Sequence, residues 1–321
     1  MNIVFFGSSN FAVPSLQALA KTKHIISCVL TQPDKEKGRG LHIEGTAIKA
    51  AADTLGLKVY QPEKINTIET VNFLKSLNAD LFVVASYGQI LSQEVLDIPK
   101  IFSINLHASL LPKYRGAAPI NWAIINGEKI TGVTVIKMER RMDAGPIILQ
   151  KTIGILNEDT EIGLQDKLSN LAAELLLECV ISIEDKNYKL KPQDEAWVSF
   201  APKLKKNDGV IDWNKSAEEI NNLIRGCMNW PGAFTYYNGK LLKIYKAKAF
   251  EFLSPSVLQS PGGIVQVSKE GIVVATGGNG LMIKELQIES KKRMRVEEFI
   301  AGHKICVGEV FKGRSQKGHP F

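Results

Sequence analysis

Cysteine is scarce in this chain, and its few occurrences are scattered. Four cysteines occur among 321 residues, and no two of them have the C-x-x-C spacing of a metal or redox motif. The pattern argues against a zinc site and against a disulfide framework. No apolar run is long enough to span a bilayer, and the N-terminus lacks the basic flank and apolar core of a secretory signal. We therefore expect a cytoplasmic protein without a membrane segment or a bound metal.

The glycine-rich fingerprint of dinucleotide-binding proteins is also missing. The apolar run Asn2 to Phe6 is followed by the turn Gly7 to Asn10 and by an amphipathic stretch from Phe11 to Leu19. Strand, turn and helix follow one another as in a nucleotide-binding unit, but the turn does not contain G-x-G-x-x-G. A dinucleotide cofactor is therefore not indicated.

Apolar strands alternate with amphipathic helices over residues 1–185. This alternation favours an α/β fold with a Rossmann-like, mostly parallel sheet that has helices on both faces. Functional residues of such sheets lie beyond the carboxyl ends of the strands. The strands are expected at 2–6, 25–31, 80–86, 101–106, 132–138 and 147–153, and the helices at 11–19, 49–55, 65–77 and 161–183. We assign residues 1–185 to a first, catalytic domain.

A second domain is expected after a polar segment. Residues 186–207 are rich in lysine and interrupted by Pro192 and Pro202, which predicts a linker. Ser216 and Glu219 then have the spacing of a helix capping box. Short strands separated by glycine-containing turns indicate an OB-like β-barrel within residues 208–321. The strands are expected at 233–237, 241–247, 263–267, 271–275 and 280–286.

The excess positive charge of the chain belongs to its second part. Up to Asp185 there are 18 Lys and Arg against 20 Asp and Glu, whereas from Lys186 onward there are 22 against 13. Neutralisation of phosphates is the main source of non-specific affinity for nucleic acid. The asymmetry therefore fits a polyanionic partner for the second domain, and it fits equally a lysine-rich surface that only keeps the protein in solution.

The stretch Ile104 to Pro119, INLHASLLPKYRGAAP, places an Asn and a His two residues apart at the end of a predicted strand. Side chains with period two point the same way in a strand, so Asn105 and His107 are expected to face one side together. Acyl transfer to an amine needs a donor directed at the developing oxyanion and a group that moves protons near neutral pH. On spacing alone, however, such a pair is more often an ordinary strand end.

The longer string INLHASLLPKYRGAAPINWAI resembles the signature of the folate-dependent formyltransferase family, and Met142 to Pro146 resembles the family's aspartate loop. The resemblance implies an enzyme with the catalytic residues Asn105, His107 and Asp143. Asn105 would donate to the oxyanion, His107 would donate to it or relay a proton, and Asp143 would orient the imidazole. The implied formyl donor is 10-formyltetrahydrofolate, without a metal. The residues implied to bind this folate are Tyr87, Gly88, Ile90, Ser109, Leu110, Leu111 and Pro112.

A second resemblance concerns the acceptor. The stretch Thr31 to Gly40, TQPDKEKGRG, resembles a loop with which members of the family contact tRNA, although relatives commonly have further lysines and a proline where Leu41 to Gly45 follow here. With the basic second domain, it implies a monomeric enzyme that formylates the α-amine of methionine on initiator tRNA for translation initiation. The expected tRNA contacts are Lys35, Lys37, Arg39, Lys203, Lys205, Lys206, Arg225, Lys291, Lys292 and Arg293.

Three alternative functions stay open at the level of sequence. The same signature occurs in enzymes that formylate an amino sugar or a ribonucleotide amine, and in domains that hydrolyse formyl-folate. A non-enzymatic RNA-binding protein would use the second domain alone. The presence of all three residues of the Asn105, His107 and Asp143 trio argues against this last alternative.

Overall fold

The computed structural model describes residues 1–37, 42–251 and 260–313, and the chain divides into two compact units. The first comprises Met1–Pro119, Ile130–Gly154 and Leu164–Pro202, and the second comprises Ile120–Lys129, Ile155–Gly163 and Lys203–Phe321. The segment predicted as a linker therefore divides at Pro202. Most of it belongs to the first unit.

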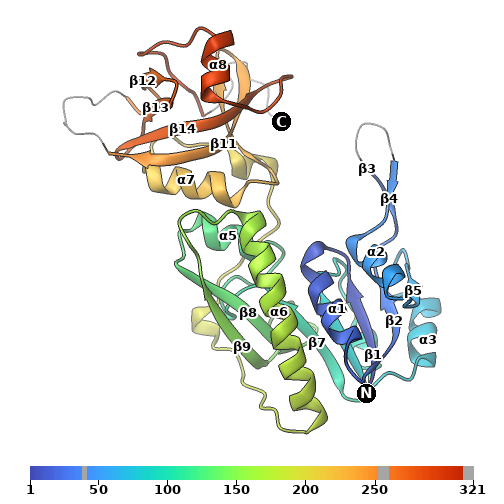
Figure 1. Cartoon of the computed structure of the whole chain (residues 1–321). Coiled ribbons are helices and arrows are strands. Elements are labelled where there is room, and N and C mark those ends of the chain that lie inside the picture. Colours follow the sequence, from blue (N-terminus) through green and yellow to red (C-terminus); the bar gives the residue numbers. More distant parts are fainter. Residues whose placement is uncertain (38–41, 252–259, 314–321) are drawn as a thin grey trace. The chain divides into compact units, whose positions relative to one another are not determined.

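A seven-stranded sheet forms the centre of the first unit (Figure 1). Its strand order is β5-β2-β1-β6-β7-β8-β9; the first five strands are parallel, and β8 and β9 run antiparallel to their neighbours. The strands are β1 (Asn2–Gly7), β2 (Ile25–Leu30), β5 (Val59–Tyr60), β6 (Leu81–Ala85), β7 (Phe102–His107), β8 (Ile130–Lys137) and β9 (Ile147–Gly154). The predicted α/β class and the mostly parallel sheet are confirmed. The two residues of β5 are too few for a periodicity to reveal them.

Both faces of this sheet are covered. Val4 and Phe6 of β1 pack on one face in a cluster that includes Leu74 of α3. Their neighbours Ile3 and Phe5, which point to the opposite face, are fully buried as well. The helices of this unit are α1 (Val13–Ala20), α2 (Ala47–Thr54), α3 (Ile68–Ser76), α4 (Gln93–Leu96) and most of α6 (Glu161–Glu184), with the short helices η1 (Asn10–Ala12) and η2 (Glu195–Trp197) and the strand pair β3 (Lys35–Lys37) and β4 (His42–Glu44).

An antiparallel sheet organises the second unit, with the order β10-β11-β14-β13-β12 and with β15 paired to β14. Its first hairpin turns at Asn238 and Gly239, whose φ values of 49° and 75° suit the two-residue turns that match strand twist. The strands are β10 (Ala233–Tyr237), β11 (Lys240–Phe250), β12 (Ile264–Ser268), β13 (Gly271–Ala275), β14 (Gly280–Ile288) and β15 (Met294–Arg295), and the helices are α5 (Pro119–Ile125, all but its first residue), η3 (Lys206–Gly209), α7 (Ala217–Gly226) and α8 (Val296–Gly302).

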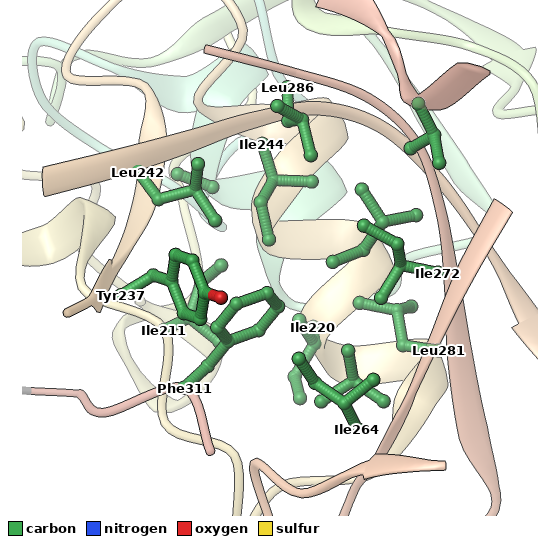
Figure 2. Packing of buried hydrophobic residues seen from close by; sticks show 14 of the residues in the cluster. Ile211, Ile220, Tyr237, Leu242, Ile244, Ile264, Ile272, Leu281, Leu286 and Phe311 are labelled. Atoms are coloured by element: carbon green, nitrogen blue, oxygen red, sulfur yellow. The ribbon is translucent and has the colours of Figure 1, made fainter. Parts of the chain in front are cut away.

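The core of the second unit lies between this sheet and α7 (Figure 2). Ile220 of α7, Ile244 of β11 and Leu281 of β14 all belong to this core. The predicted capping box at the start of α7 is confirmed, because the Glu219 amide donates to Ser216 Oγ over 3.2 Å and the Ser216 amide donates to the Glu219 carboxylate over 2.9 Å.

The predicted strands of the second unit are observed, but their ladders do not close into a barrel among the described residues. Among the described residues, the strand ladders leave β10 and β12 at opposite edges of the sheet. Isolated bridges join Lys312 to Tyr236 in β10 and Val310 to Gly263, the residue before β12, so the segment from 310 to 312 contacts both edges. The antiparallel sheet is established. Its OB-like character stays a prediction.

Candidate active site

The carboxyl ends of three parallel strands meet at one edge of the first sheet. Gly7 at the end of β1 is in register with Ala85 at the end of β6, and Val84 is in register with Asn105 near the end of β7. The loops that follow are joined by hydrogen bonds: Ser8 Oγ and Gln32 Nε2 both donate to the Tyr87 carbonyl, over 3.0 and 3.1 Å. This edge is where open α/β sheets bind their ligands.

Asn105, His107 and Asp143 come together at this edge. Asn105 Nδ2 donates to Asp143 Oδ1 over 3.3 Å, and His107 Nδ1 lies 3.6 Å from Asp143 Oδ2. Two residues come from the end of β7 as the period-two spacing predicted, and the third comes from the loop between β8 and β9. The proximity of all three is thus observed.

The Asp143 carboxylate is held from several sides. Its Oδ2 also accepts a hydrogen bond of 2.9 Å from the Gly116 amide. Gly116 has a φ of 126°, and a Cβ there would lie 2.6 Å from the Ala201 carbonyl oxygen, so only glycine fits. The side chains of His107 and Asp143 are 6% and 11% exposed. Little water reaches the pair, which strengthens the electrostatic interaction between them.

One hydrogen bond assigns the tautomer of His107. Its Nε2 lies 2.9 Å from the Tyr114 carbonyl oxygen. A carbonyl only accepts, so Nε2 carries a proton and donates. The remaining nitrogen, Nδ1, faces the Asp143 carboxylate. Nδ1 therefore carries the lone pair in the neutral tautomer.

The predicted folate segment from Ser109 to Pro112 is fastened to β8 and β9. Thr134, which lies opposite His107 in β8, donates from Oγ1 to the Ser109 carbonyl over 2.6 Å and accepts from the Leu111 amide over 3.1 Å. Gln150 Nε2 donates to the Leu111 carbonyl over 3.0 Å. The backbone groups of Ser109 and Leu111 are thus hydrogen-bonded within the chain. The side chain of Leu110 is half-buried, so part of it is accessible to a ligand.

The loop after β6 presents its predicted folate residues differently. Tyr87 is 2% exposed and its ring packs edge-on against Phe6, so the phenol lies in the core and burial raises its pKa. Gly88 has a φ of 83° and is exposed. Ile90 is 69% exposed. Of these three residues, only Ile90 offers an accessible side chain.

The predicted tRNA contacts fall into two groups. Most are exposed lysines and arginines, namely Lys35, Lys203, Lys205, Lys206, Lys291, Lys292 and Arg293. Arg225 differs because it is half-buried, and it donates to the Leu156 and Asp159 carbonyls over 3.2 and 2.5 Å and to Asn222 Oδ1 over 2.6 Å. Its burial lowers its pKa. Arg39 and the side chain of Lys37 lie outside the described residues.

Several residues around the trio had not been predicted from the sequence. Thr134 and Gln150 hold the segment from Ser109 to Leu111, and Gln193 and Arg115 hold the aspartate loop. The alternation of β8 could have indicated Thr134 as a polar residue on a buried strand. Gln193 lies in a polar, proline-interrupted segment that has no periodicity, so only the tertiary structure reveals it.

Within residues 1–37, 42–251 and 260–313, no group of three or more His, Cys, Asp or Glu side chains is placed to hold a metal ion. In the same part of the chain, no helix combines the length and the apolar character needed to cross a membrane.

Comparison with known proteins identifies the class of protein that this fold and site define. The family model "Formyl transferase" matches residues 1–180, and the model "Formyl transferase, C-terminal domain" matches residues 203–304. The chain belongs to the formyl transferase family. A protein of Acetivibrio thermocellus named methionyl-tRNA formyltransferase is 46% identical over 97% of this chain and 99% of its own length. A protein of the same name from Clostridioides difficile is 45% identical over the same shares of both chains.

Solved structures of lower identity share the fold. A variant of HypX from Aquifex aeolicus has a TM-score of 0.65 and 19% identity, covering 95% of this chain and 48% of its own. An N-formyltransferase from Helicobacter canadensis, solved with folinic acid and dTDP-3-aminofucose, has a TM-score of 0.65 and 21% identity, covering 91% of this chain and 99% of its own.

Proposed function

We propose that this protein transfers the formyl group of 10-formyltetrahydrofolate to the α-amine of methionine on initiator tRNA. One observation carries the proposal: a chain that is 46% identical to a methionyl-tRNA formyltransferase over nearly its whole length places Asn105 Nδ2 and His107 Nδ1 at 3.3 and 3.6 Å from the carboxylate oxygens of Asp143. The product would be formylmethionyl-tRNA, used in translation initiation in the cytoplasm.

The residues at the carboxyl edge of the sheet fit a folate donor in part. Exposed Ile90 and half-buried Leu110 offer apolar surface to a flat ring. The backbone groups of Ser109 and Leu111 are engaged by Thr134 and Gln150, so their proposed contribution is the shape of the segment rather than direct hydrogen bonds. The donor supplies the electrophilic formyl carbon.

Asn105 is proposed to stabilise the negative charge that develops on the formyl oxygen when the amine attacks. One hydrogen of its amide points to Asp143 Oδ1, which fixes the side chain and leaves the second hydrogen for the substrate. A donor fixed in this way does not need to reorganise during the reaction. Removing such a donor typically slows acyl transfer by about 100-fold to 1,000-fold.

His107 is proposed to take up the proton that the attacking amine loses, at Nδ1. The Tyr114 carbonyl accepts from Nε2 and holds the ring in place, so a second proton makes the ring an imidazolium. Asp143 stabilises this cation through Oδ2 at 3.6 Å. The proton is then available for the folate nitrogen that leaves. No residue needs to become covalently attached to the formyl group.

The second unit is proposed to bind the tRNA with an OB-like sheet. Residues 203–321, which form most of this unit, carry 19 Lys and Arg against 11 Asp and Glu, which suits a phosphate backbone. Exposed Lys203, Lys205 and Lys206 and the group from Lys291 to Arg293 are the proposed contacts, with Lys35, Lys37 and Arg39 contributed by the first unit. Because Arg225 binds carbonyl groups of its own chain, we assign it to the stability of the second unit instead.

The acceptor is tested with labelled 10-formyltetrahydrofolate and four reactions: initiator methionyl-tRNA, elongator methionyl-tRNA, an amino-sugar nucleotide, and no acceptor. We expect label on the methionine of the initiator tRNA, at a rate well above that of the elongator tRNA. Label on the amino sugar alone would replace the proposed acceptor. Release of labelled formate without any labelled acceptor would indicate a formyl-folate hydrolase.

A further inference from the structure

The segment from Lys191 to Ala201, here called the strap, is fastened to the active-site loops along its length. Lys191 exchanges two backbone hydrogen bonds with Ile147 at the start of β9, and Ala201 donates to the Arg115 carbonyl over 2.7 Å. In the middle of the strap, the amide of Gln193 makes four hydrogen bonds. The sequence pattern predicted a linker here. The structure shows a packed element of the first unit.

Gln193 connects the two loops that form the candidate active site. Its Nε2 donates to the carbonyl oxygens of Asp143 and Gly145, over 2.8 and 2.7 Å. Its Oε1 accepts from Nε and Nη2 of Arg115, over 3.0 and 2.8 Å. Arg115 immediately precedes Gly116, whose amide binds the Asp143 carboxylate. The aspartate loop is therefore held from both sides: through its side chain by Gly116, and through its backbone by Gln193.

Two further features make this connection specific. Asp143 has a φ of 51°, a left-handed conformation that a non-glycine residue keeps only when its surroundings hold it there. Arg115 is 2% exposed, and the partners of its guanidinium that the described residues provide are both on the strap, Gln193 and Glu195. Gln193 therefore binds both the buried Arg115 and the backbone of Asp143, whose left-handed conformation needs support.

We propose that Gln193 is a positioning residue: by clamping the Asp143 backbone to Arg115, it holds the Asp143 carboxylate within reach of Asn105 and His107. This inference rests on the proposed function, since it assigns to Gln193 a role in the same reaction. Gln193 itself does not touch the reacting atoms. Its effect is expected on the turnover number, because the geometry of the trio matters when charge develops and not when the substrates bind.

The substitution Gln193→Glu keeps the hydrogen bonds to Arg115 and removes those to the carbonyls of Asp143 and Gly145. A carboxylate keeps an acceptor for Arg115, but it places an oxygen instead of an NH₂ group against the carbonyls of Asp143 and Gly145. The matched control is Gln17→Glu, the same change at an exposed position of α1. Because a misplacement of about 1 Å at a reacting group costs on the order of 100-fold, we expect kcat of Gln193→Glu to fall about 100-fold. KM for the folate donor and for methionyl-tRNA should stay within about twofold of wild type.

A second readout does not depend on the acceptor. Crystal structures of wild type and of Gln193→Glu are compared for the distance between Asp143 Oδ2 and His107 Nδ1, which is 3.6 Å here. A displacement of about 1 Å supports the inference. An unmoved aspartate overturns it, whether or not the wild type formylates methionyl-tRNA.

The kinetic outcomes distinguish this inference from the proposed function. A wild type that does not label methionyl-tRNA contradicts the proposed function alone, and the structural comparison then decides on Gln193. An active wild type with a Gln193→Glu variant of normal kcat, or with a loss carried by KM, overturns the positioning role. If Gln193→Glu does not fold, Gln193→Met is measured in its place. The methionine side chain has about the same length as glutamine and can neither donate to the Asp143 carbonyl nor accept from Arg115 as the amide does.

Discussion

Replacing Asp143 by Asn is a small change in shape that removes the charge from the centre of the site. Both carboxylate oxygens accept hydrogen bonds, Oδ1 from Asn105 and Oδ2 from Gly116. An amide has one acceptor oxygen, so in either orientation its NH₂ group would face an N–H group. Asn tolerates the left-handed conformation that Asp143 adopts. We therefore expect Asp143→Asn to fold, with a loss of stability of about 1–3 kcal/mol from the mismatched donor.

The effect on turnover follows from the distance between the charges. An imidazolium 3.6 Å from a carboxylate is stabilised by roughly 4–5 kcal/mol at an effective dielectric constant of about 20. Each step of about 1.4 kcal/mol in the barrier changes the rate tenfold. The loss of this stabilisation therefore predicts a fall in kcat of about 10³-fold. KM should change little, because the imidazolium forms only during the reaction.

The measurement is single-turnover formylation of methionyl-tRNA at saturating donor, which isolates the chemical step. Asp53→Asn, at an exposed position of α2, makes the same substitution far along the chain from the trio and should match wild type. A rate for Asp143→Asn within about tenfold of wild type would refute the electrostatic role assigned to Asp143.

Three further predictions concern charge and stability. Arg225→Lys should lower the melting temperature without changing the salt dependence of tRNA binding, because Arg225 binds carbonyls of its own chain. Lys205→Ala should reduce the salt dependence of tRNA binding, because Lys205 is exposed. The reverse pattern would restore Arg225 as a tRNA contact. Hydrogen bonds from Arg115 and Arg141 hold the pKa of Glu195 below its usual range. The folded state therefore gains its full stabilisation from Glu195 above the ordinary pKa of a glutamate, and loses it as the pH falls through the lowered pKa. The difference in melting temperature between wild type and Glu195→Gln should shrink on acidification. A difference that grows would contradict this assignment. Burial raises the pKa of three of the four cysteines to about 11 or 12, and the fourth is exposed, so a thiol reagent at pH 8 should label one thiol per native chain; rapid labelling of more than one would show that a core opens.

Much of the first unit could be predicted because its strands are short apolar runs with clear ends. The pair Asn105 and His107 was accessible for the same reason, since period two in a strand fixes the relative direction of two side chains. Asp143 was located through resemblance to a family, because nothing in its local sequence points to β7. Its position depends on how β8 pairs with β7.

The parts that the sequence did not predict depend on contacts between distant segments. Gln193 is 50 residues from Asp143 and lies in a segment whose composition is that of a linker. Its side-chain amide nevertheless donates to the backbone carbonyl of Asp143. Tyr87 was expected at the ligand, but the chain turns after β6 so that its ring enters the core. Arg225 was expected to meet phosphate, and its helix instead directs it at backbone carbonyls. Composition identifies a charged residue but not its partner.

Asn105→Ala is compared with wild type in the transfer of labelled formyl from 10-formyltetrahydrofolate to initiator methionyl-tRNA. We expect label on the methionine amine with wild type, and a rate about 100-fold to 1,000-fold lower for Asn105→Ala at unchanged tRNA affinity. Labelled formate with no labelled tRNA, or equal rates for the two proteins, would contradict this expectation.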